Sequence, residues 1–345
     1  KGGGMAAVGI PDYRLPKDIL NHEIDLIKRT GVDIRLNSKI DKMDWDDMQK
    51  KGYKAAYLAI GAHVGTKVGC GGEEIASDDF VQGAEFLRRF SLGEKIAAKN
   101  KVVIIGGGNV ALDCARSCVR LGFKDVQIVY RRSRNEMPAS KIEIEEAEQE
   151  GVKISFLKAP VNIVRKAGKV TGIECIKMKL GEPDASGRKR PIPIKGSEST
   201  IATDMIIAAT GQKPDVDLFK GKNAVQLTDW GTIMAKAAAG FETNVAGIFA
   251  GGDCVSGPAT LIEALNMGNK AAQGIDAYIQ GKKVPAEISL GGLDTKAQRT
   301  AGFVPKEAAA GVTFLEPKTR LHTFAEVEGA FSVPDAIKEA GRCLR

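Results

Sequence analysis

The fold is decided by one stretch of the chain, KVVIIGGGNVALDCARSCVRLGFKDVQIVYRRSR at residues 101–134. Residues 101–105 form an almost wholly apolar run, which is typical of a buried strand. A glycine turn at residues 106–108 follows, and residues 112–121 then carry apolar side chains at helical spacing. Residues 126–130 again read as an apolar strand. This order predicts a β-α-β unit with parallel strands, because a parallel pair needs a crossover of about this length.

The glycine turn has the pattern Gly106-x-Gly108-x-x-Ala111. The first glycine permits the tight turn, and the second lets the backbone approach a diphosphate. The small Ala111 allows the helix to pack closely on the strand, and the helix N-terminus offers free N–H donors to an anion. A glycine-rich turn without a ligand would have the same sequence. Because strands and a helix flank it here, we predict a dinucleotide-binding site.

The end of the second strand bears on which nicotinamide cofactor binds. The strand ends in YRRSR at residues 130–134, and no acidic residue occurs until Glu136. An acidic side chain there would accept hydrogen bonds from a ribose 2'-hydroxyl, whereas arginine can hold a 2'-phosphate through two hydrogen bonds. A solvated basic loop is the alternative interpretation. The sequence therefore favours NADP over NAD.

A second junction of strand, glycine turn and helix lies near the C-terminal third of the chain. The apolar residues 247–250 precede Gly251-Gly252-Asp253, and a helix is expected over residues 260–279. The short carboxylate of Asp253 could accept hydrogen bonds from a sugar-like hydroxyl, and the helix dipole could stabilise negative charge on a reduced flavin. An aspartate in an ordinary turn between strand and helix would have the same sequence. Two such junctions indicate two nucleotide-binding lobes.

Length and composition fit this interpretation. A chain of 345 residues is long enough for about two domains. The net charge of +7 is dispersed among acidic residues, which disfavours nucleic acid as a partner, and no apolar run is long enough to span a membrane. The chain begins at Lys1 without an initiator methionine and ends at Arg345, so we expect a fragment of a longer protein.

The six cysteines form no C-x-x-C pair. This usage predicts reduced thiols and a cytoplasmic protein. Cys114 and Cys118 are spaced to share one face of the predicted helix, where small apolar side chains facing the sheet explain them better than a redox pair. The three histidines are scattered and show no ligand spacing.

Further elements follow from periodicity and turn residues. We expect helices over residues 16–30 and 139–150, strands over 32–36, 54–61, 152–157, 161–165, 169–178 and 205–209, a loop over 181–192, and an extended tail with a short terminal helix over 284–345.

Several motifs resemble the glutamate synthase small subunit family. They are GGM at residues 3–5, GIPDYRLP at 9–16, IIGGGNVALD at 104–113, YRRSRNEMPA at 130–139, ATGQKP at 209–214 and GGD at 251–253. The resemblance covers roughly residues 2–282 and extends to the corresponding modules of dihydropyrimidine dehydrogenase and of NADH-dependent ferredoxin:NADP oxidoreductase.

The resemblance implies an α/β fold with two Rossmann-like dinucleotide-binding domains, similar to glutathione reductase, in which the NAD(P) domain is inserted into the FAD domain. The expected limits are residues 1–94 and 240–283 for the FAD domain, 95–239 for the NAD(P) domain, and 284–345 for a C-terminal extension. The family's first G-x-G-x-x-G, which holds FAD, would precede Gly2 and is absent from this chain.

Roles for individual residues follow from the same resemblance. Gly106, Gly108, Asn109 and Val110 would hold the NADPH diphosphate, Arg131 and Arg132 its 2'-phosphate, and Gly252, Asp253, Thr260 and Leu261 the FAD, with Gly211 also in the cofactor-binding set. Cys343 resembles the first member of a cysteine cluster and would be a ligand of a 4Fe-4S cluster.

The function implied is hydride exchange between NADP(H), or NAD(H), and FAD, with electrons passed to iron-sulfur or flavoprotein subunits of a larger complex. No catalytic side chain is required, because the protein contributes positioning and electrostatics. Two alternatives remain. One is a nucleotide-binding scaffold without turnover, and the other is a disulfide reductase, which would need a cysteine pair facing the flavin.

Overall fold

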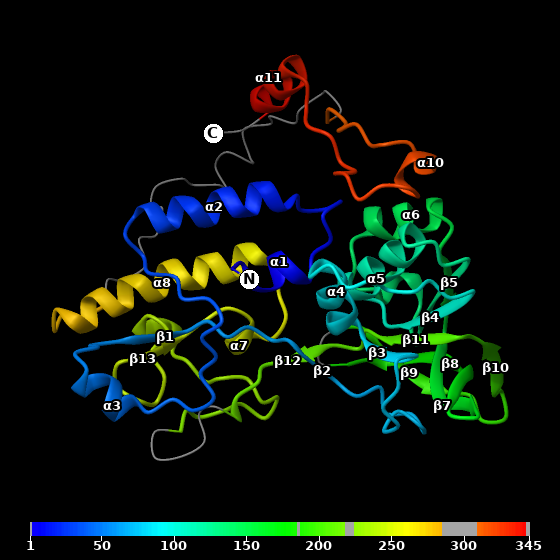
Figure 1. The fold of residues 1–345 in the computed structure, drawn as a ribbon, viewed down its shortest axis with the longest axis horizontal. Coiled ribbons are helices and arrows are strands. Elements are labelled where there is room, and N and C mark those ends of the chain that lie inside the picture. Colours follow the sequence, from blue (N-terminus) through cyan, green and yellow to red (C-terminus); the bar gives the residue numbers. More distant parts are fainter. Residues whose placement is uncertain (1, 185–186, 218–223, 285–308, 343–345) are drawn as a thin grey trace.

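The computed structural model describes residues 2–184, 187–217, 224–284 and 309–342. Its centre is a five-stranded parallel sheet with the order β3-β11-β4-β5-β6 (Figure 1). The strands are β3 (Phe80–Gln82), β4 (Lys101–Ile105), β5 (Asp125–Tyr130), β6 (Lys153–Phe156) and β11 (Met205–Ala208). The predicted β-α-β unit is thus present as β4, α5 (Asn109–Arg120) and β5, which pair in parallel from Lys101 to Ile105.

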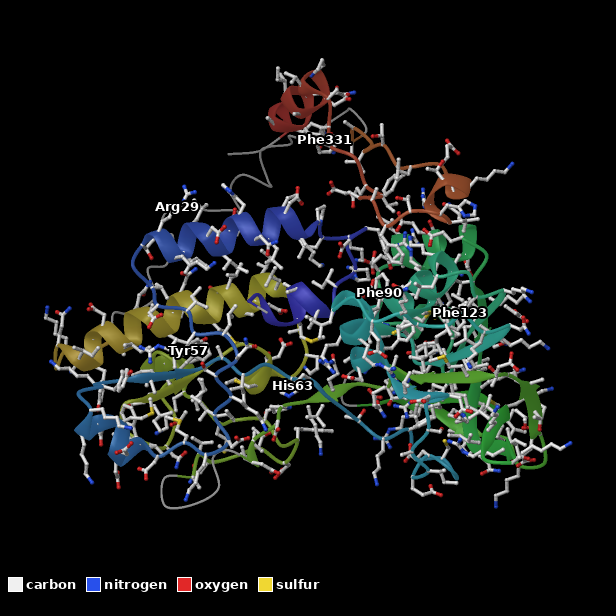
Figure 2. All side chains as sticks on the ribbon, viewed as in Figure 1. Arg29, Tyr57, His63, Phe90, Phe123 and Phe331 are labelled. Atoms are coloured by element: carbon white, nitrogen blue, oxygen red, sulfur yellow. The ribbon has the colours of Figure 1, made fainter. Side chains whose placement is uncertain are left out.

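The two faces of this sheet are covered differently. Along β4, Val102 and Ile104 pack against α4 (Gly83–Ser91), α5 and α6 (Lys141–Gln149), because alternate side chains of a strand point to opposite faces. Val103 and Ile105 pack instead against an antiparallel sheet. Phe90 and Phe123, labelled in Figure 2, lie on the helical side. Both faces are therefore buried, which explains why β4 and β11 are almost wholly apolar.

The antiparallel sheet is inserted between β6 and β11. It consists of β7 (Lys158–Lys166), β8 (Lys169–Pro183), β9 (Lys189–Pro193) and β10 (Ser199–Ala202), with β8 paired to all three others. The expected loop at residues 181–192 is in part a hairpin between β8 and β9. β8 extends to Pro183, beyond the strand expected over 169–178, because its exposed face carries polar residues that interrupt the apolar pattern.

The second unit is built around the parallel pair β1 (Ala56–Leu58) and β13 (Ile248–Ala250). Trp45, Leu58 and Ile248 form its core, with Cys254 in the same cluster. The helices are α1 (Gly4–Val8), α2 (Lys17–Arg29), α3 (Trp45–Lys50), α7 (Asp253–Ser256) and α8 (Leu261–Ile279), and a short helix η3 (Ala237–Ala239) precedes β13. Figure 1 shows α2 and α8 side by side above this strand pair.

A two-stranded antiparallel link joins the units. β2 (Val64–Gly65) pairs with β12 (Gln212–Lys213), and β12 follows β11 at the carboxyl end of the central sheet. The chain thus enters the five-stranded sheet through β2 and leaves it through β12, as expected for one domain inserted into another.

Most predicted elements are confirmed, and besides the loop at 181–192 two further expectations differ from the structure. Residues 32–36 form no strand: Val32, Ile34 and Leu36 are exposed, and the described residues provide no partner strand for them. Strand β3 and helix α4, at residues 80–91, belong to the central sheet, although we expected that unit to begin at residue 95. The short apolar run of β3 gave too little pattern to recognise.

The C-terminal segment returns to the helical side of the central sheet. It contains α10 (Pro317–Arg320), which lies beside α6 in Figure 1, and α11 (Val333–Gly341). Beneath this segment lies a group of buried charged side chains on the helices. Asp113 on α5 is 5% exposed and accepts hydrogen bonds from Arg14, while Arg116 and Arg120 bind Glu150 on the neighbouring helix end.

Asp113 makes the stability of the fold depend on pH. Burial raises the pKa of Asp113 to about 6, against the charge and hydrogen bonds of Arg14, which lower it. The folded chain therefore binds this proton more tightly than an unfolded chain, whose Asp pKa is 3.8. The contribution to stability is full at low pH and is lost as the pH rises from about 4 to about 6.

We expect Asp113→Asn to remove this decline. Denaturant unfolding at about pH 4.5 and about pH 6.5 would give the free energy of unfolding at each pH. The difference between these two free energies should be smaller in the variant than in the unmodified chain. Asp79→Asn is the matched control, since the pKa of Asp79 is lowered by bonds from Ser77, Val170 and Arg165 despite its desolvation, and its effect lies at lower pH. If the free energy of unfolding of Asp113→Asn fell between the two pH values as much as that of the unmodified chain, the assignment would be contradicted.

Candidate functional site

The first glycine turn is tightly enclosed at two of its three glycines. Gly106 has a φ of 147°, and a Cβ there would lie 2.2 Å from the carbonyl oxygen of Ala209 on the neighbouring strand. A Cβ at residue 107 would lie 2.5 Å from the ring of Tyr130. At Gly108 the nearest atom would be 3.8 Å away, on Pro138. The turn is therefore packed against protein at its first two glycines and open at Gly108.

Helix α5 begins at this open position. Gly108 is its N-cap and provides no side-chain capping bond. The first hydrogen bond of the helix runs from the N–H of Ala111 to the carbonyl of Gly108. In the described part of the chain, no acceptor is recorded for the N–H groups of Gly108, Asn109 and Val110. Unsatisfied donors at a helix N-terminus attract a phosphate group. Three of the four residues predicted to hold the diphosphate, Gly108, Asn109 and Val110, thus lie together at an open turn with free backbone donors.

The two predicted arginines lie in different environments. Arg132 is 5% exposed; its guanidinium donates to Asp184 at 2.6 Å and to the carbonyl of Lys189 at 2.9 Å, and so binds the β8–β9 hairpin. Arg131 is exposed at the carboxyl end of β5. Arg134, by contrast, pairs with Glu148. These contacts leave Arg131, rather than Arg132, as the arginine available to a 2'-phosphate.

Tyr130 is a contributor that sequence reasoning missed. Its ring covers Gly107, and its hydroxyl donates to the carbonyl of Glu136 at 2.6 Å. A capping box, in which Ser133 and Glu136 bind each other, closes the short helix η1 (Arg134–Glu136) in the same loop. Tyr130 therefore fixes the arginine-bearing loop against the glycine turn. An aromatic residue at a strand end is the signal that could have indicated this.

Gly211 lies at the link between the two units. Its φ is 132°, and its carbonyl accepts from the N–H of Thr66 at 3.0 Å. The hydroxyls of Thr66 and Thr210 are also 3.4 Å apart. Gly211 thus allows the chain to turn from β11 into β12, and its predicted contact with a cofactor remains a prediction.

The second glycine turn places Asp253 at the end of β13. Gly252 has a φ of 71° and precedes α7, and a Cβ at Gly251 would lie 2.2 Å from the hydroxyl oxygen of Tyr57. The Asp253 carboxylate is partly buried and accepts from the N–H of Ala259 at 3.3 Å. Desolvation raises its pKa, the bond from Ala259 lowers it, and the charge of Glu263 raises it. Asp253 is thus held by the backbone of Ala259, just before α8.

Thr260 and Leu261 stand at the beginning of α8. Thr260 accepts from the N–H of Glu263 at 3.2 Å, and the Glu263 carboxylate accepts from the N–H of Thr260 at 2.9 Å, a capping box. Leu261 is half exposed, and Ile262 and Leu265 are exposed beside it. Exposed apolar side chains in the first turns of α8 fit the contact with a large aromatic ring system, a feature the sequence pattern of α8 did not reveal.

The cysteines in the described part of the chain are buried. Cys114 and Cys118 lie in the core between α5 and the sheet, as expected, and Cys254 donates to the carbonyls of Leu58 and Gly251. Burial raises the pKa of Cys114, Cys118 and Cys254. No group of metal-binding side chains occurs among the described residues, and Cys343 lies outside them.

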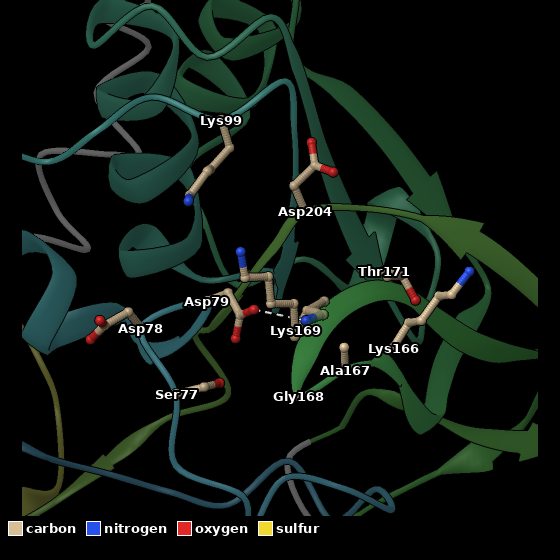
Figure 3. Close-up of a pocket in the computed structure, with 11 residues that line it drawn as sticks. Ser77, Asp78, Asp79, Lys99, Lys166, Ala167, Gly168, Lys169, Thr171 and Asp204 are labelled. Carbon is tan, nitrogen blue, oxygen red and sulfur yellow. Dashed lines mark hydrogen bonds between the residues drawn. The ribbon is translucent and has the colours of Figure 1, made fainter.

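A cavity of about 730 Å³ lies at the other edge of the central sheet (Figure 3). Lys99 and Asp204, which precede β4 and β11, line it together with Asp79 and Lys169. Ligands of parallel α/β sheets bind at the carboxyl ends of the strands, and this cavity lies at the amino ends. It is therefore separate from the glycine turns. None of the helices that the structure describes is long and apolar enough to cross a membrane.

Residues 7–268 match the family described as "Pyridine nucleotide-disulphide oxidoreductase". The chain belongs to this family. The expected enzyme class, a pyridine-nucleotide oxidoreductase, is thereby confirmed. Among solved structures of the fold, FprA of Mycobacterium tuberculosis in complex with NADPH has a TM-score of 0.62 at 19% identity, covering 80% of this chain and 74% of that one.

Other relatives confirm the resemblance to the glutamate synthase small subunit. The chain is 33% identical to "Glutamate synthase [NADPH] small chain" of Escherichia coli (strain K12), covering 81% of this chain and 61% of that one. It is 41% identical to "NADP(+)-dependent formate dehydrogenase subunit beta" of Moorella thermoacetica, covering 99% of this chain and 49% of that one. Thioredoxin reductase of T. acidophilum shares the fold with a TM-score of 0.60 at 21% identity, covering 81% and 88%.

The chain spans about half the length of the two kinds of relatives that it matches over nearly its full length, the first of which is the formate dehydrogenase subunit. It covers 56% of "NADPH-Fe(3+) oxidoreductase subunit beta" of Geobacter sulfurreducens, to which it is 36% identical over its full length. The predicted fold, two dinucleotide-binding domains of the α/β class, is confirmed by the family and by the structural neighbours.

The open space at Gly108 gives a sharp test of the turn. We expect Gly108→Ala to fold with an unchanged melting temperature, because the new methyl has room and the backbone is extended there. It should weaken NADP⁺ binding about tenfold or more, since the methyl occupies the side on which a diphosphate approaches. Calorimetric titration and thermal unfolding would measure the two effects.

Gly122→Ala, at a glycine of positive φ after α5, is the control for a change in stability alone. It should lower the melting temperature and leave the affinity for NADP⁺ as it is. Equal NADP⁺ affinity in Gly108→Ala and the unmodified chain would rule out binding at this turn.

Proposed function

We propose that the chain is the NAD(P)H-dependent FAD oxidoreductase module of a larger complex, exchanging hydride between NADP(H) and FAD and passing electrons to iron-sulfur partners. The observation that carries this proposal is the pair of strand–glycine–helix turns, one ending at Gly108 and one at Asp253, each at the carboxyl end of parallel strands. FAD, when bound, accepts two electrons together as a hydride and can release them one at a time.

The nicotinamide nucleotide is assigned to the first turn. The N–H groups of Gly108, Asn109 and Val110 would bind its diphosphate, and Gly106 keeps the turn close to β11. Arg131 would bind the 2'-phosphate, which favours NADP(H) over NAD(H). The names of three kinds of relatives, which include NADP(+) or NADPH, support this choice.

FAD is assigned to the second turn. Asp253 would accept a hydrogen bond from a sugar hydroxyl of FAD, and the N-terminus of α8, from Thr260 and Leu261, would face the flavin. The exposed apolar side chains of Ile262 and Leu265 fit this role, because they would otherwise lie in water. Gly252 and Gly211 complete the proposed cofactor-binding set.

The partners are proposed from the relatives. Two of them are named as beta subunits, and the chain spans about half of each, so partner subunits and further segments are expected. We propose that Cys343 begins a 4Fe-4S ligand set. The free, buried cysteines fit a reducing compartment, for which we propose the cytoplasm.

Burial of the cysteines argues against a disulfide reductase. Such an enzyme needs two thiols that reach both the flavin and the substrate, and Cys114, Cys118 and Cys254 are enclosed in cores. Experiment can distinguish a nucleotide-binding scaffold from the proposed oxidoreductase module, because a scaffold would carry no reducible flavin.

Arg131→Ala should raise the Michaelis constant for NADPH about tenfold or more, because charge-assisted hydrogen bonds to a phosphate contribute about 1.5–3 kcal/mol. The constant for NADH should stay as it is. Steady-state reduction of a dye by the native complex would measure both. Arg132→Ala should instead destabilise the β8–β9 hairpin and shift both constants alike. Equal effects of Arg131→Ala on NADPH and NADH would refute the assignment.

The proposal as a whole is tested on the native complex. Anaerobic NADPH should bleach the visible absorbance of bound flavin, and the full-length protein should be purified with FAD. A complex without a yellow chromophore, or one whose flavin NADPH does not reduce, would favour the scaffold instead.

A further inference from the structure

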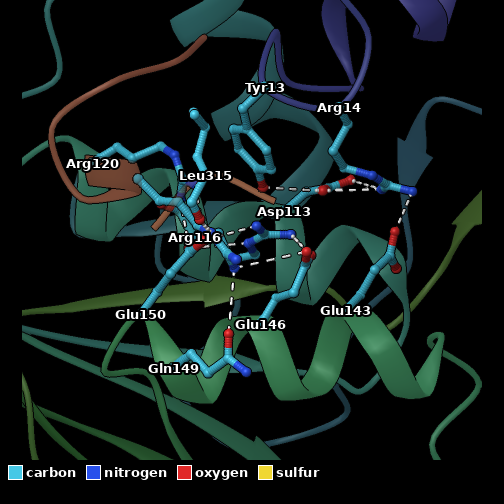
Figure 4. A network of polar contacts seen from close by, with 11 residues as sticks. Tyr13, Arg14, Asp113, Arg116, Arg120, Glu143, Glu146, Gln149, Glu150 and Leu315 are labelled. Carbon is cyan, nitrogen blue, oxygen red and sulfur yellow. Dashed lines mark hydrogen bonds and ion pairs between the residues drawn. The ribbon is translucent and has the colours of Figure 1, made fainter. Parts of the chain in front are cut away.

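A buried charge network lies where three parts of the chain meet (Figure 4). Its members are Tyr13 and Arg14 from the segment before α2, Asp113, Arg116 and Arg120 on α5, and Glu143, Glu146 and Glu150 on or next to α6. The C-terminal segment covers it. The proposed chemistry uses none of these side chains, although burying so many charges is costly unless each one is paired.

The first contact joins the N-terminal segment to α5. Arg14 donates to both carboxylate oxygens of Asp113, at 3.0 and 2.8 Å, and pairs with Glu143 at 2.5 Å. One guanidinium therefore bridges α5 and α6. The planar fork of arginine suits this geometry, whereas a lysine ammonium is a single point charge.

Tyr13 adds a second contact to the same helix. Its ring is 1% exposed and lies 4.7 Å from the guanidinium carbon of Arg116 and 4.1 Å from that of Arg120. Its hydroxyl donates to Asp113 at 3.3 Å. Cation–π contacts of this kind are strongest away from water. Residues 13 and 14 are thus fixed on α5 by stacking and by charge together.

The arginines under Tyr13 are themselves held by α6 and the loop after it. Arg116 binds Glu146 at 2.8 Å and Glu150 at 2.7 Å, and Arg120 binds Glu150 at 2.6 Å. Removing one member would leave a buried charge without its partner, which costs several kcal/mol. The orientation of α5 is therefore determined by several contacts that support one another.

The C-terminal segment closes the network from outside. The N–H of Val327 donates to the carbonyl of Tyr13 at 3.0 Å, and Arg120 donates to the carbonyl of Thr323 at 3.0 Å. Phe324 packs against Phe90 of α4 with ring centroids 4.7 Å apart. Arg320 donates to the carbonyl of Leu315 and, at 3.5 Å, to Gln149. The segment is thereby bound to both the N-terminal segment and the nucleotide-binding unit.

The position of Asp113 connects this network with the candidate site. Asp113 lies one turn after Asn109, on the helix whose first N–H groups form the open anion-binding turn. A helix of this length moves as a rigid rod, because each residue is hydrogen-bonded to the next turn. The segment that holds Asp113 therefore also sets the direction in which the turn at Gly108 faces.

We propose that Arg14 and Tyr13 are positioning residues, which hold α5 and its glycine turn in a fixed orientation relative to the flavin-side unit, and that residues 314–328 of the C-terminal segment stabilise this arrangement. The inference rests on the proposed function, because the orientation matters only if a nicotinamide nucleotide at α5 must meet a second cofactor. Misplacement by about 1 Å can lower a rate about a hundredfold.

The test compares Arg14→Gln with Arg165→Gln. Arg165 is the matched control: it is also a poorly exposed arginine paired with a carboxylate, Asp79 at 3.3 Å, but its pair lies away from α5. Three quantities are measured on the native complex: amide hydrogen exchange of residues 109–116 and 323–328, affinity for NADP⁺, and the single-turnover rate of flavin reduction by NADPH.

For Arg14→Gln we expect amide exchange in both segments to rise at least tenfold, the rate of flavin reduction to fall about tenfold or more, and NADP⁺ affinity to change less than threefold. Arg165→Gln should alter none of the three. Arg14→Lys should give the same changes with smaller amplitude, since it keeps a charge but not the fork, and it serves if Arg14→Gln does not fold.

Unchanged exchange and unchanged flavin reduction in Arg14→Gln would overturn the proposal. A fall in NADP⁺ affinity equal to the fall in rate would also overturn it, because it would make Arg14 part of the binding site. If the unmodified complex does not bind NADP⁺, the proposed function fails, and the exchange data alone still decide whether Arg14 holds α5.

Discussion

The close approach of the Ala209 carbonyl to Gly106 is the constraint on which this structure depends. A Cβ at residue 106 would lie 2.2 Å from this oxygen, so the turn after β4 can pass this close to the end of β11 because residue 106 is glycine. Gly108, the N-cap of α5, follows two residues later, so the start of the helix is placed beside this contact. One steric condition thus shapes the carboxyl edge of the sheet and the start of α5 together.

Much of the fold could be predicted because its strands are buried on both faces. β4 and β11 read as almost continuous apolar runs, and the glycines that follow mark the turns, so the β-α-β unit could be inferred from residues 101–134. Strand β3 and residues 32–36 show the limit of this approach. Whether a short apolar run forms a strand depends on a partner elsewhere in the chain, and local sequence contains no such information.

The candidate site was predicted less completely than the fold, for a related reason. The glycine turns are local and were found, but the environment of each arginine in YRRSR depends on distant residues. Arg132 is occupied by Asp184, and Tyr13 stacks between arginines about a hundred positions away. Pairs of charged residues have no fixed spacing in sequence, so the buried charge network could not be recognised before the fold was known.

The contact between Arg132 and the β8–β9 hairpin has an evolutionary consequence. The hairpin lies in the inserted antiparallel sheet, outside the β-α-β unit that forms the anion-binding turn. A relative with a shorter or uncharged hairpin would leave its second arginine unpaired at the strand end, while the turn stays the same. Under the proposed function, selectivity between the two nicotinamide nucleotides would therefore diverge through changes in a peripheral hairpin, without mutation of the residues proposed to bind the diphosphate.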